Sequence, residues 1–331
     1  MPGRPISNSL TVAPEAIRTA SERLRAGGLV AFPTETVYGL GADAASPDAV
    51  RRLYEVKGRP ADHPVIVHLA GAAQLDEVGR DVPETARQLA AAFWPGPLTI
   101  VVRRNSERVA AEVTGGRDTV GLRVPDHAVA LELLASFGGG VAAPSANRFG
   151  RVSPTTAAHV RADLGADVRV VLEGGPCRVG VESTIVDLVG GEPAILRVGG
   201  VSRAAIEQVI GRECVLHTTG ETAAPGTPAS HYSPRCDVEK VEAEAVGARA
   251  RDLSARGRRA GLLVMRPVPP ELPGELVVLD APVDVEEYAR VLYARLREAD
   301  EHLLDVLLVV VPPASDGLGA AVADRVCRAS H

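Results

Sequence analysis

The chain has 331 residues, of which 36 are Lys or Arg and 42 are Asp or Glu, so its formal net charge is -6. This mildly acidic balance argues against a dedicated nucleic-acid or anionic-membrane binder. With 46% hydrophobic and 24% charged residues, the composition is that of a folded globular chain and excludes a disordered or fibrous sequence. The 33 glycines and 25 prolines indicate many tight turns and glycine-lined loops.

The length indicates two domains, because one domain usually holds about 100 to 200 residues. The longest apolar stretch, 303–313, contains Asp305 and falls far short of the ~20 residues that a membrane span needs. No apolar run of signal-peptide type opens the chain, and its 4 cysteines have no CxxC spacing. We therefore expect a protein of the reduced cytoplasm without a membrane span.

Helix and strand signals alternate along the first two thirds of the chain. Pro14 opens a predicted helix that ends at Gly27-Gly28, the strand 29–32 follows, and Ser46 with Pro47 begins the next helix as N-cap and first residue. Further strands are predicted at 64–69, 98–103, 119–124, 140–143, 168–172, 184–189 and 194–198. Further helices are predicted at 84–93, 127–137, 154–164 and 203–210.

A change in composition at 217–234, where Thr, Gly, Pro and Ala replace any periodic pattern, predicts a linker. Beyond it, helical patterns separate short apolar runs, an order typical of a small, largely parallel sheet covered on both faces. These strands are predicted at 261–265, 275–279 and 306–311, and the helices at 243–255, 285–299 and 318–328. We thus expect a catalytic domain at 1–217, a linker at 218–236 and a smaller α/β domain at 237–331.

The segment 33–41, PTETVYGLG, leaves a predicted buried strand and places two hydroxyls, a carboxylate and two glycines in one turn. Ligands of open α/β sheets bind beyond the carboxyl ends of strands, so a pocket is expected there. A polar connecting loop explains the same spacing equally well.

Lys57-Gly58-Arg59-Pro60 follows a predicted helix and pairs a compact ammonium with a planar guanidinium, a combination that suits phosphate oxygens. Lys57 and Lys240 are the only lysines, although arginine is abundant, which favours a specific role for Lys57. The alternative is a solvated pair at a helix C-terminus, where cations are favoured in any case.

Arg123 ends a predicted strand that is otherwise apolar apart from Thr119. A lone buried cation is costly, so either a protein carboxylate or an acidic ligand must pair with it. His63 and His68 lie on opposite faces around another strand, which argues against a shared metal ion. His68 is placed to hydrogen-bond a ligand, although an ordinary satisfied histidine is the simpler interpretation.

Two further segments carry polar residues in loops. The segment 144–155 runs through Ser145, Asn147 and Ser153 into a predicted helix, whose first N–H groups can bind an anion; Ser153 would otherwise be its N-cap. Glu182-Ser183-Thr184 opens a strand after a Gly-Gly turn. The sequence contains no GxSxG, HExxH, GxxxxGK[ST] or GxGxxG motif, which disfavours common hydrolases and excludes two common nucleotide loops.

The chain resembles the YrdC-like threonylcarbamoyl-adenylate synthases in a series of motifs between residues 29 and 200. In chain order these are PTETVYGLGA, KGRP, PVIVH, WPGPLT, TVGLRVP, APSAN, SPT, ESTIVD and ILRVG. The His231-Tyr232-Ser233-Pro234 segment and the α/β tail resemble the long, two-domain form of the family. The resemblance implies a twisted mixed sheet with flanking helices, followed by a Rossmann-like C-terminal domain.

The resemblance also implies an activity: L-threonine, bicarbonate or CO2 and ATP are converted to threonylcarbamoyl-AMP and pyrophosphate. Partner proteins then transfer the threonylcarbamoyl group to an adenosine of tRNA. The threonine site would contain Thr36, His68, Arg123, Ala143 and Ser183. The ATP site would contain Lys57, Arg59, His63, Thr119, Ser145, Asn147, Ser153, Arg197 and Tyr232.

Three positions depart from the family pattern: His63 stands where Asn is usual, Ala143 where Thr or Ser is common, and 226–230 replaces basic and aromatic linker residues. The reaction needs a planar cation that can donate two hydrogen bonds to the threonine carboxylate, and Arg123 offers one. It also needs cations beside the phosphates, which would be Lys57, Arg59, Arg197 and Mg2+. No protein nucleophile is required. Two alternatives remain: a related carbamoyl-adenylate-forming enzyme, and a binding module for structured RNA, which the net charge disfavours.

Overall fold

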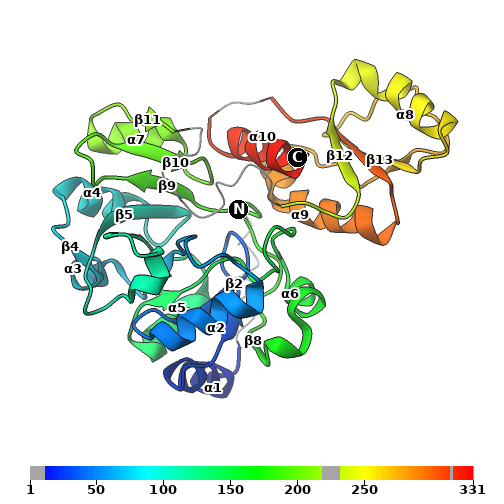
Figure 1. Cartoon of the computed structure of the whole chain (residues 1–331). Coiled ribbons are helices and arrows are strands. Elements are labelled where there is room, and N and C mark those ends of the chain that lie inside the picture. Colours follow the sequence, from blue (N-terminus) through cyan, green and yellow to red (C-terminus); the bar gives the residue numbers. More distant parts are fainter. Residues whose placement is uncertain (1–11, 218–231, 314–315, 331) are drawn as a thin grey trace, which may run out of the picture.

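The computed structural model describes residues 12–217, 232–313 and 316–330, which form two α/β bodies (Figure 1). An 11-stranded mixed sheet underlies the N-terminal body and a 4-stranded sheet the C-terminal body. This confirms the predicted fold class, although four of these strands were not predicted. Most of the predicted linker, including His231 and 226–230, lies outside the described residues. No helix in the described ranges has both the length and the apolar character needed to cross a bilayer.

The N-terminal sheet runs in the order β11-β10-β9-β5-β6-β3-β7-β2-β1-β8, with β4 paired to β5. Strand β5 is antiparallel to β6 and parallel to β9, so the sheet is mixed. The strands are β1 (Val30–Phe32), β2 (Gly39–Asp43), β3 (Val67–His68), β4 (Gly79–Arg80), β5 (Leu98–Arg104), β6 (Thr119–Arg123), β7 (Val141–Ala142), β8 (Val170–Val171), β9 (Thr184–Asp187), β10 (Ala194–Arg197) and β11 (Val215–Leu216).

Strand β2 was not predicted, because its sequence GLGAD contains two glycines that weaken a strand signal. The reason for one of them is close packing against the neighbouring strand. A Cβ atom on Gly41 would lie 2.8 Å from Cγ1 of Val141 in β7. The segment 33–41 is therefore a short loop followed by a strand, and not a single turn.

The helices of the N-terminal body are α1 (Pro14–Arg25), α2 (Pro47–Lys57), α3 (Leu75–Val78), α4 (Glu84–Phe93), α5 (Ala128–Phe137), α6 (Ala157–Leu164) and α7 (Arg203–Ile210). The predicted cap of α2 is confirmed, since the Ala49 N–H donates to Oγ of Ser46. The alternative N-cap role of Ser153 is wrong: Thr156 caps α6, accepting from the His159 N–H, and residues 154–156 precede the helix. The Ser153 hydroxyl is thereby left for another contact.

The C-terminal sheet has the order β12-β15-β13-β14, and every pair in it is parallel, as predicted. Its first strand was not predicted, because the alternating sequence DVEK is short and follows the linker composition. The elements are β12 (Asp237–Lys240), α8 (Val246–Ala255), β13 (Ala260–Leu263), β14 (Val277–Val278), α9 (Val285–Glu301), β15 (Val306–Val309) and α10 (Leu318–Ala329).

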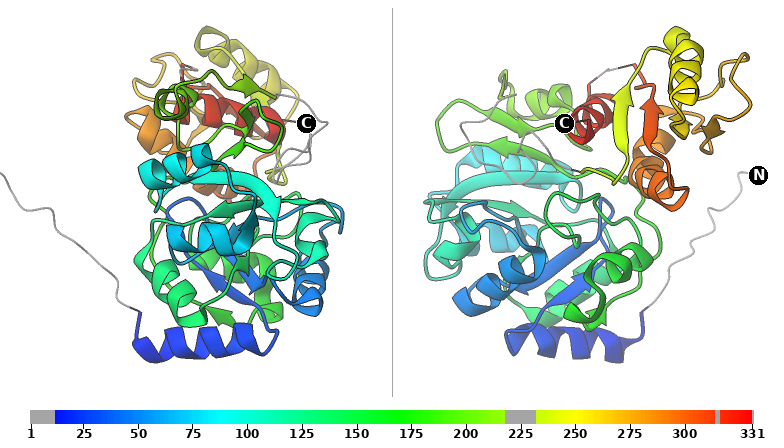
Figure 2. Two further views of the ribbon diagram at one scale, coloured as in Figure 1. Left: turned by 90° about the vertical axis from the view of Figure 1, so that its left-hand side faces the viewer. Right: turned by 45° about the vertical axis from the view of Figure 1, so that its right-hand side comes forward.

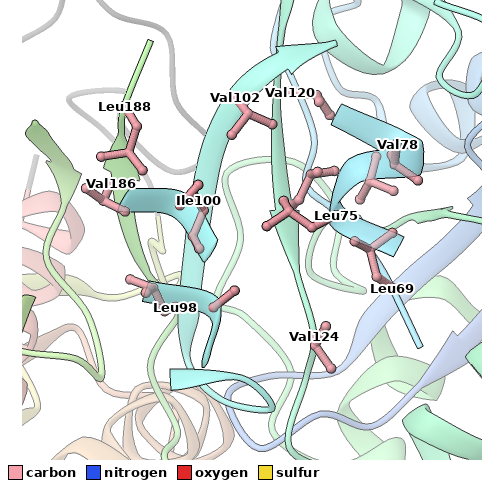
Figure 3. Close-up of a cluster of buried hydrophobic side chains, with 14 of the residues drawn as sticks. Leu69, Leu75, Val78, Leu98, Ile100, Val102, Val120, Val124, Val186 and Leu188 are labelled. Carbon is pink, nitrogen blue, oxygen red and sulfur yellow. The ribbon is translucent and has the colours of Figure 1, made fainter. Parts of the chain in front are cut away.

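Apolar side chains from β5, β6, β9 and the helices beside them fill the largest core of the N-terminal body (Figure 3). A second apolar cluster crosses between the bodies, because Val37, Val152 and Val181 pack with residues of α9 and α10. These two helices lie on the side of the C-terminal body that faces the N-terminal body (Figures 1 and 2). Arg297 of α9 also pairs with Asp163 of α6 at 2.6 Å. The two bodies are thus packed through both apolar and charged contacts.

Candidate functional site

A cavity open to solvent, with a volume of about 50 Å3 for the centres of water-sized molecules, lies where several loops of the N-terminal body meet near Tyr232. Its walls come from the loop after β1, from β3, from the end of β6, from the segment after β7 and from the segments next to β9 and β10. Nine of the predicted site residues line it: Thr36, Arg59, His68, Arg123, Ala143, Ser145, Ser183, Arg197 and Tyr232.

Arg123 is buried in this cavity wall and is held by three groups of the N-terminal body. Its Nε donates to the Gly96 carbonyl at 3.2 Å and its Nη1 donates to Oγ1 of Thr36 at 2.9 Å. Its Nη2 lies 2.7 Å from Oε2 of the buried Glu35. Sequence reasoning left a protein carboxylate or an acidic ligand as the partner of Arg123, and the structure places a carboxylate there.

The contact between Arg123 and Glu35 is close but poorly aligned. Within the described ranges, neither Nη2 of Arg123 nor either oxygen of Glu35 has a hydrogen-bond partner of good geometry. A buried polar atom in that state usually signals a missing ligand or water. The guanidinium therefore has capacity to bind a ligand carboxylate without giving up an aligned hydrogen bond.

His68 ends β3 beside Arg123 and is neutral. Burial, assisted by the positive charge of Arg123, lowers the pKa of the imidazole to about 3. Its ring lies edge-on to Phe32 at 5.9 Å, and its Nδ1 has no hydrogen-bond partner among the described residues. A neutral imidazole in the cavity wall can exchange a hydrogen bond with a ligand hydroxyl or amine.

Ser183 and Arg197 form a hydrogen-bonded group on another wall. The Ser183 hydroxyl lies 2.8 Å from Oγ1 of Thr99 and 3.1 Å from Nη2 of Arg197. Nε of Arg197 also donates to the Ser183 carbonyl at 3.0 Å. Burial lowers the pKa of Arg197 from its ordinary value. This arrangement fixes a buried cation within a few ångströms of a hydroxyl in the same cavity.

Arg59 faces the cavity from the loop after α2. Its Nε donates to the His63 carbonyl at 3.2 Å and its Nη2 to the Pro64 carbonyl at 2.9 Å, while its guanidinium lies 5.7 Å from the centre of the Phe149 ring. Three neighbouring groups thus fix its orientation. Gly58, with a φ of 63°, ends α2 in the left-handed conformation and turns the chain toward this position.

Lys57 lies behind the cavity wall. Its Nζ donates to the carbonyls of Ser145 (2.6 Å) and Asn147 (2.5 Å), and burial together with the charge of Arg59 lowers its pKa well below the ordinary value. The structure therefore uses this rare lysine as a brace between the end of α2 and the loop 145–147. It does not place the ammonium among the cavity-lining groups of the described residues.

Four other predicted residues lie away from the cavity surface. His63 packs against Phe149, and Thr119 begins β6 at the end opposite Arg123. Asn147 donates to the carbonyls of Arg148 and Arg151 and keeps a buried Oδ1 without a partner among the described residues. Ser153 donates to the carboxylate of Glu182 at 2.7 Å.

Sequence reasoning missed two buried carboxylates, Glu35 and Glu182. Each stands inside a quoted motif, next to a residue that was singled out, but their partners come from distant parts of the chain. Glu182 lines the cavity and its pKa is about 2: burial raises it, but Arg325 and Arg197 outweigh that effect. It is the only carboxylate lining the cavity within the described ranges.

No group of acidic, His or Cys side chains suited to a metal ion is found within the described ranges. Both oxygens of Glu182 already accept hydrogen bonds from protein side chains. The described cavity residues thus do not build a metal site of their own.

Comparison with known families matches both parts of the chain. Residues 22–199 match the Sua5/YciO/YrdC family, described as "telomere recombination", and residues 201–331 match the C-terminal domain of threonylcarbamoyl-AMP synthase. A threonylcarbamoyl-AMP synthase of Pyrococcus abyssi is 42% identical, with 95% of this chain and 94% of that protein covered. One of Bacillus subtilis is 36% identical, with 98% and 96% covered.

Solved structures agree with these matches over nearly the whole chain. The P. abyssi Sua5 protein in complex with L-threonine has a TM-score of 0.89 at 39% identity, covering 97% of this chain and 95% of that one. A variant of the same protein gives a TM-score of 0.91 at 38% identity, covering 98% and 95%.

Proposed function

Because the chain belongs to the threonylcarbamoyl-AMP synthase family in its long, two-domain form, we propose that its cavity binds L-threonine beside ATP and joins them through a carbamate. The activity is that of a nucleotidyltransferase that forms threonylcarbamoyl-AMP and pyrophosphate for the modification of tRNA. The observation that supports this use of the cavity is the convergence of nine residues from eight separate segments of the chain on one set of walls.

In the proposed threonine site, Arg123 binds the carboxylate. A planar guanidinium can donate two parallel hydrogen bonds to a carboxylate, and its imperfect contact with Glu35 leaves this capacity available. Thr36, His68 and Ser183 surround the hydroxyl and amine, with Ala143 beside them. Neutral His68 does not repel the amine, which must be uncharged to react.

The proposed nucleotide site lies next to it. Arg59 and Arg197 face the triphosphate, and Tyr232 closes the cavity over the nucleotide. Lys57 holds the loop that carries Ser145 and Asn147, so it acts on ATP through that loop. His63, Thr119 and Ser153 complete the proposed nucleotide surroundings from the outer layer.

The chemistry then requires positioning and charge stabilisation. The neutral amine of threonine adds to CO2 with loss of a proton, or reacts with bicarbonate with loss of water, to give a carbamate. A carbamate oxygen then attacks the α-phosphorus while pyrophosphate leaves. Negative charge grows on the phosphate oxygens, where Arg59 and Arg197 stabilise it. The product is a mixed anhydride that water hydrolyses, so closure over the cavity protects it.

Several finer assignments belong to the same proposal. A Mg2+ ion would enter with the nucleotide, since this ion prefers phosphate oxygens and water and the cavity offers no free carboxylate among its described residues. Residues 1–217 act as the catalytic domain, 218–236 as linker and 237–331 as supporting domain. The product passes to transfer proteins that modify tRNA, and the enzyme works in the cytoplasm.

An omission experiment tests this function. Purified protein with L-threonine, bicarbonate, ATP and Mg2+ should release pyrophosphate, and leaving out any one of them should abolish release. Pyrophosphate release without threonine would contradict the proposal. Release that needs carbamoyl phosphate in place of threonine would indicate the related carbamoyl-adenylate chemistry, whereas salt-sensitive RNA capture without turnover would indicate an RNA-binding module.

A further inference from the structure

Glu182, in the wall of the cavity, is held by side chains of the C-terminal body. Its Oε2 accepts from the Tyr293 hydroxyl of α9 at 2.7 Å and from Nε of Arg325 of α10 at 2.8 Å. Its Oε1 accepts from Ser153 at 2.7 Å. The side chain of Arg325 is 0% exposed, and its Nη2 also donates to the Val198 carbonyl at 3.0 Å.

The same two C-terminal side chains enclose Tyr232, another residue of the cavity wall. The rings of Tyr232 and Tyr293 stack with centres 5.4 Å apart and planes 26° apart, and the Arg325 guanidinium lies 5.5 Å from the centre of the Tyr232 ring. Tyr232 has a φ of 65°, a left-handed conformation that is strained for a bulky residue. Such strain persists only where the surroundings enforce it.

The buried hydrogen bonds and ion pair that join Glu182 to Tyr293 and Arg325 are not needed simply to pack the two bodies together. Replacing a buried ion pair with apolar residues of similar size is often neutral or stabilising, so the pair by itself is weak evidence for a stabilising role. Here the network ends on Glu182 and Tyr232, both of which line the cavity. Glu182 is also adjacent in sequence to Ser183, to which Arg197 is hydrogen-bonded.

We propose that Arg325 and Tyr293 are positioning residues for the nucleotide side of the cavity. From the C-terminal body they fix the carboxylate of Glu182 and the ring of Tyr232, and through Glu182 they act on Ser153 and Arg197 of the proposed nucleotide site. The C-terminal body thereby sets the affinity for ATP without touching it. This inference rests on the proposed function, since it assigns that side of the cavity to the nucleotide.

A matched pair of tyrosine variants tests it. Tyr293→Phe removes the hydrogen bond to Glu182 and keeps the stacked ring. Tyr288→Phe is the control, because Tyr288 lies on the same helix, is equally buried and donates only within the C-terminal body, to the Val310 carbonyl at 3.1 Å. Each variant loses one hydrogen bond of a buried tyrosine, but the bond to the Glu182 carboxylate is shorter and charge-assisted, so Tyr293→Phe should lose more stability than Tyr288→Phe.

For Tyr293→Phe we expect the Kd and the KM for ATP to rise about fivefold, which is less than the full effect of a lost hydrogen bond to a charged group, because this bond acts on ATP only through Glu182. The KM for threonine and the constants of Tyr288→Phe should change less than about twofold. ATP binding by calorimetry needs no turnover, so it tests the inference even if the omission experiment contradicts the proposed function. Equal ATP affinity in the two variants, measured at a temperature at which thermal melts show both to be folded, would overturn the positioning role.

Arg325 gives an independent test. Arg325→Lys keeps the positive charge, but a single ammonium group cannot donate to both the Glu182 carboxylate and the Val198 carbonyl as the guanidinium does. We therefore expect ATP affinity to fall about tenfold. Should Arg325→Lys not fold, the pair Arg325→Met with Glu182→Gln removes both buried charges and should recover folding while ATP affinity stays low. Wild-type ATP affinity in either folded variant would contradict the inference.

Discussion

The two walls of the cavity are held in different ways. On the proposed threonine side, the partners of Arg123 among the described residues all belong to the N-terminal body: the carbonyl of Gly96, the hydroxyl of Thr36 and the carboxylate of Glu35. On the opposite side, Glu182 and Tyr232 are held by Tyr293 and Arg325 of the C-terminal body. One wall therefore needs only its own domain, whereas the other depends on how the two bodies pack.

The largest change in ligand binding should come from removing Arg123, the cation on the wall that is held only by the N-terminal body. Arg123→Ala should raise the KM for threonine about 100-fold or more, because a charge-assisted fork to a carboxylate contributes up to ~3 kcal/mol. The Kd for ATP should stay within about threefold, since Arg123 belongs to the threonine side.

Direct binding of both ligands to the Arg123→Ala variant checks this. The variant also leaves Glu35 as an unpaired buried carboxylate, so a thermal melt must first show that the protein is folded. Equal losses for threonine and ATP would remove the distinction between the two walls.

A smaller change in ligand binding is expected from replacing Lys57, which lies behind the cavity wall on the proposed nucleotide side. Lys57→Met leaves the carbonyls of Ser145 and Asn147 without their donor, and we expect the KM for ATP to rise about tenfold with a smaller change for threonine. Lys240→Met is the matched control, because the chain's other lysine is exposed at the end of β12. If the two variants behave alike in steady-state kinetics, the bracing role of Lys57 is wrong.

The link to the C-terminal body should also appear in the pH dependence of stability. The pKa of Glu182 is lowered from 4.5 to about 2, so its ionised form stabilises the fold fully above about pH 4.5, and this contribution is lost as the pH falls toward 2. Glu182→Gln should therefore be less stable than the wild type at pH 7, by on the order of 2 kcal/mol, and the gap should close on acidification.

Denaturant unfolding of the two proteins from pH 7 to pH 3 measures this gap. Glu207→Gln serves as a control, because the pKa of Glu207 is also lowered but its partners Arg203 and the Cys214 N–H lie within the N-terminal body. A gap between wild type and Glu182→Gln that does not change with pH would contradict an ionised Glu182.

The smallest effect concerns His68. Burial and Arg123 lower its pKa to about 3, so in the folded protein the imidazole is neutral at physiological pH and becomes protonated only near pH 3. The KM for threonine should therefore show no inflection near pH 6.5. An inflection there that disappears in His68→Gln would show that His68 titrates as an ordinary histidine.

Local signals predicted most of the fold. The cap formed by Ser46 and Pro47, the alternating helices and strands and the parallel C-terminal sheet all depend on neighbouring residues. Strand β2 escaped prediction because its glycines are explained by close packing on β7, a contact across about one hundred residues. Ser153 was offered as an N-cap because Ser suits that position, and only the distant Glu182 accounts for its actual contact.

In the candidate site, too, local motifs could be predicted from the sequence, but contacts between distant parts of the chain could not. The motifs identified Arg59, Arg123, Ser145 and Ser183, and all four line one cavity. The sequence could not choose between a protein carboxylate and a ligand as the partner of Arg123, because Glu35 is 88 residues away along the chain. Nor could it connect Glu182 to Arg325, since that contact exists only after the two bodies have packed.

A structure of the protein with L-threonine and a non-hydrolysable ATP analogue tests the central claim most directly. The threonine carboxylate should lie on Arg123, and the phosphates should lie against Arg59 and Arg197 in the same cavity, with the Tyr232 ring still between Tyr293 and Arg325. Threonine or nucleotide bound outside this cavity, or a Tyr232 ring displaced from both neighbours, would contradict it.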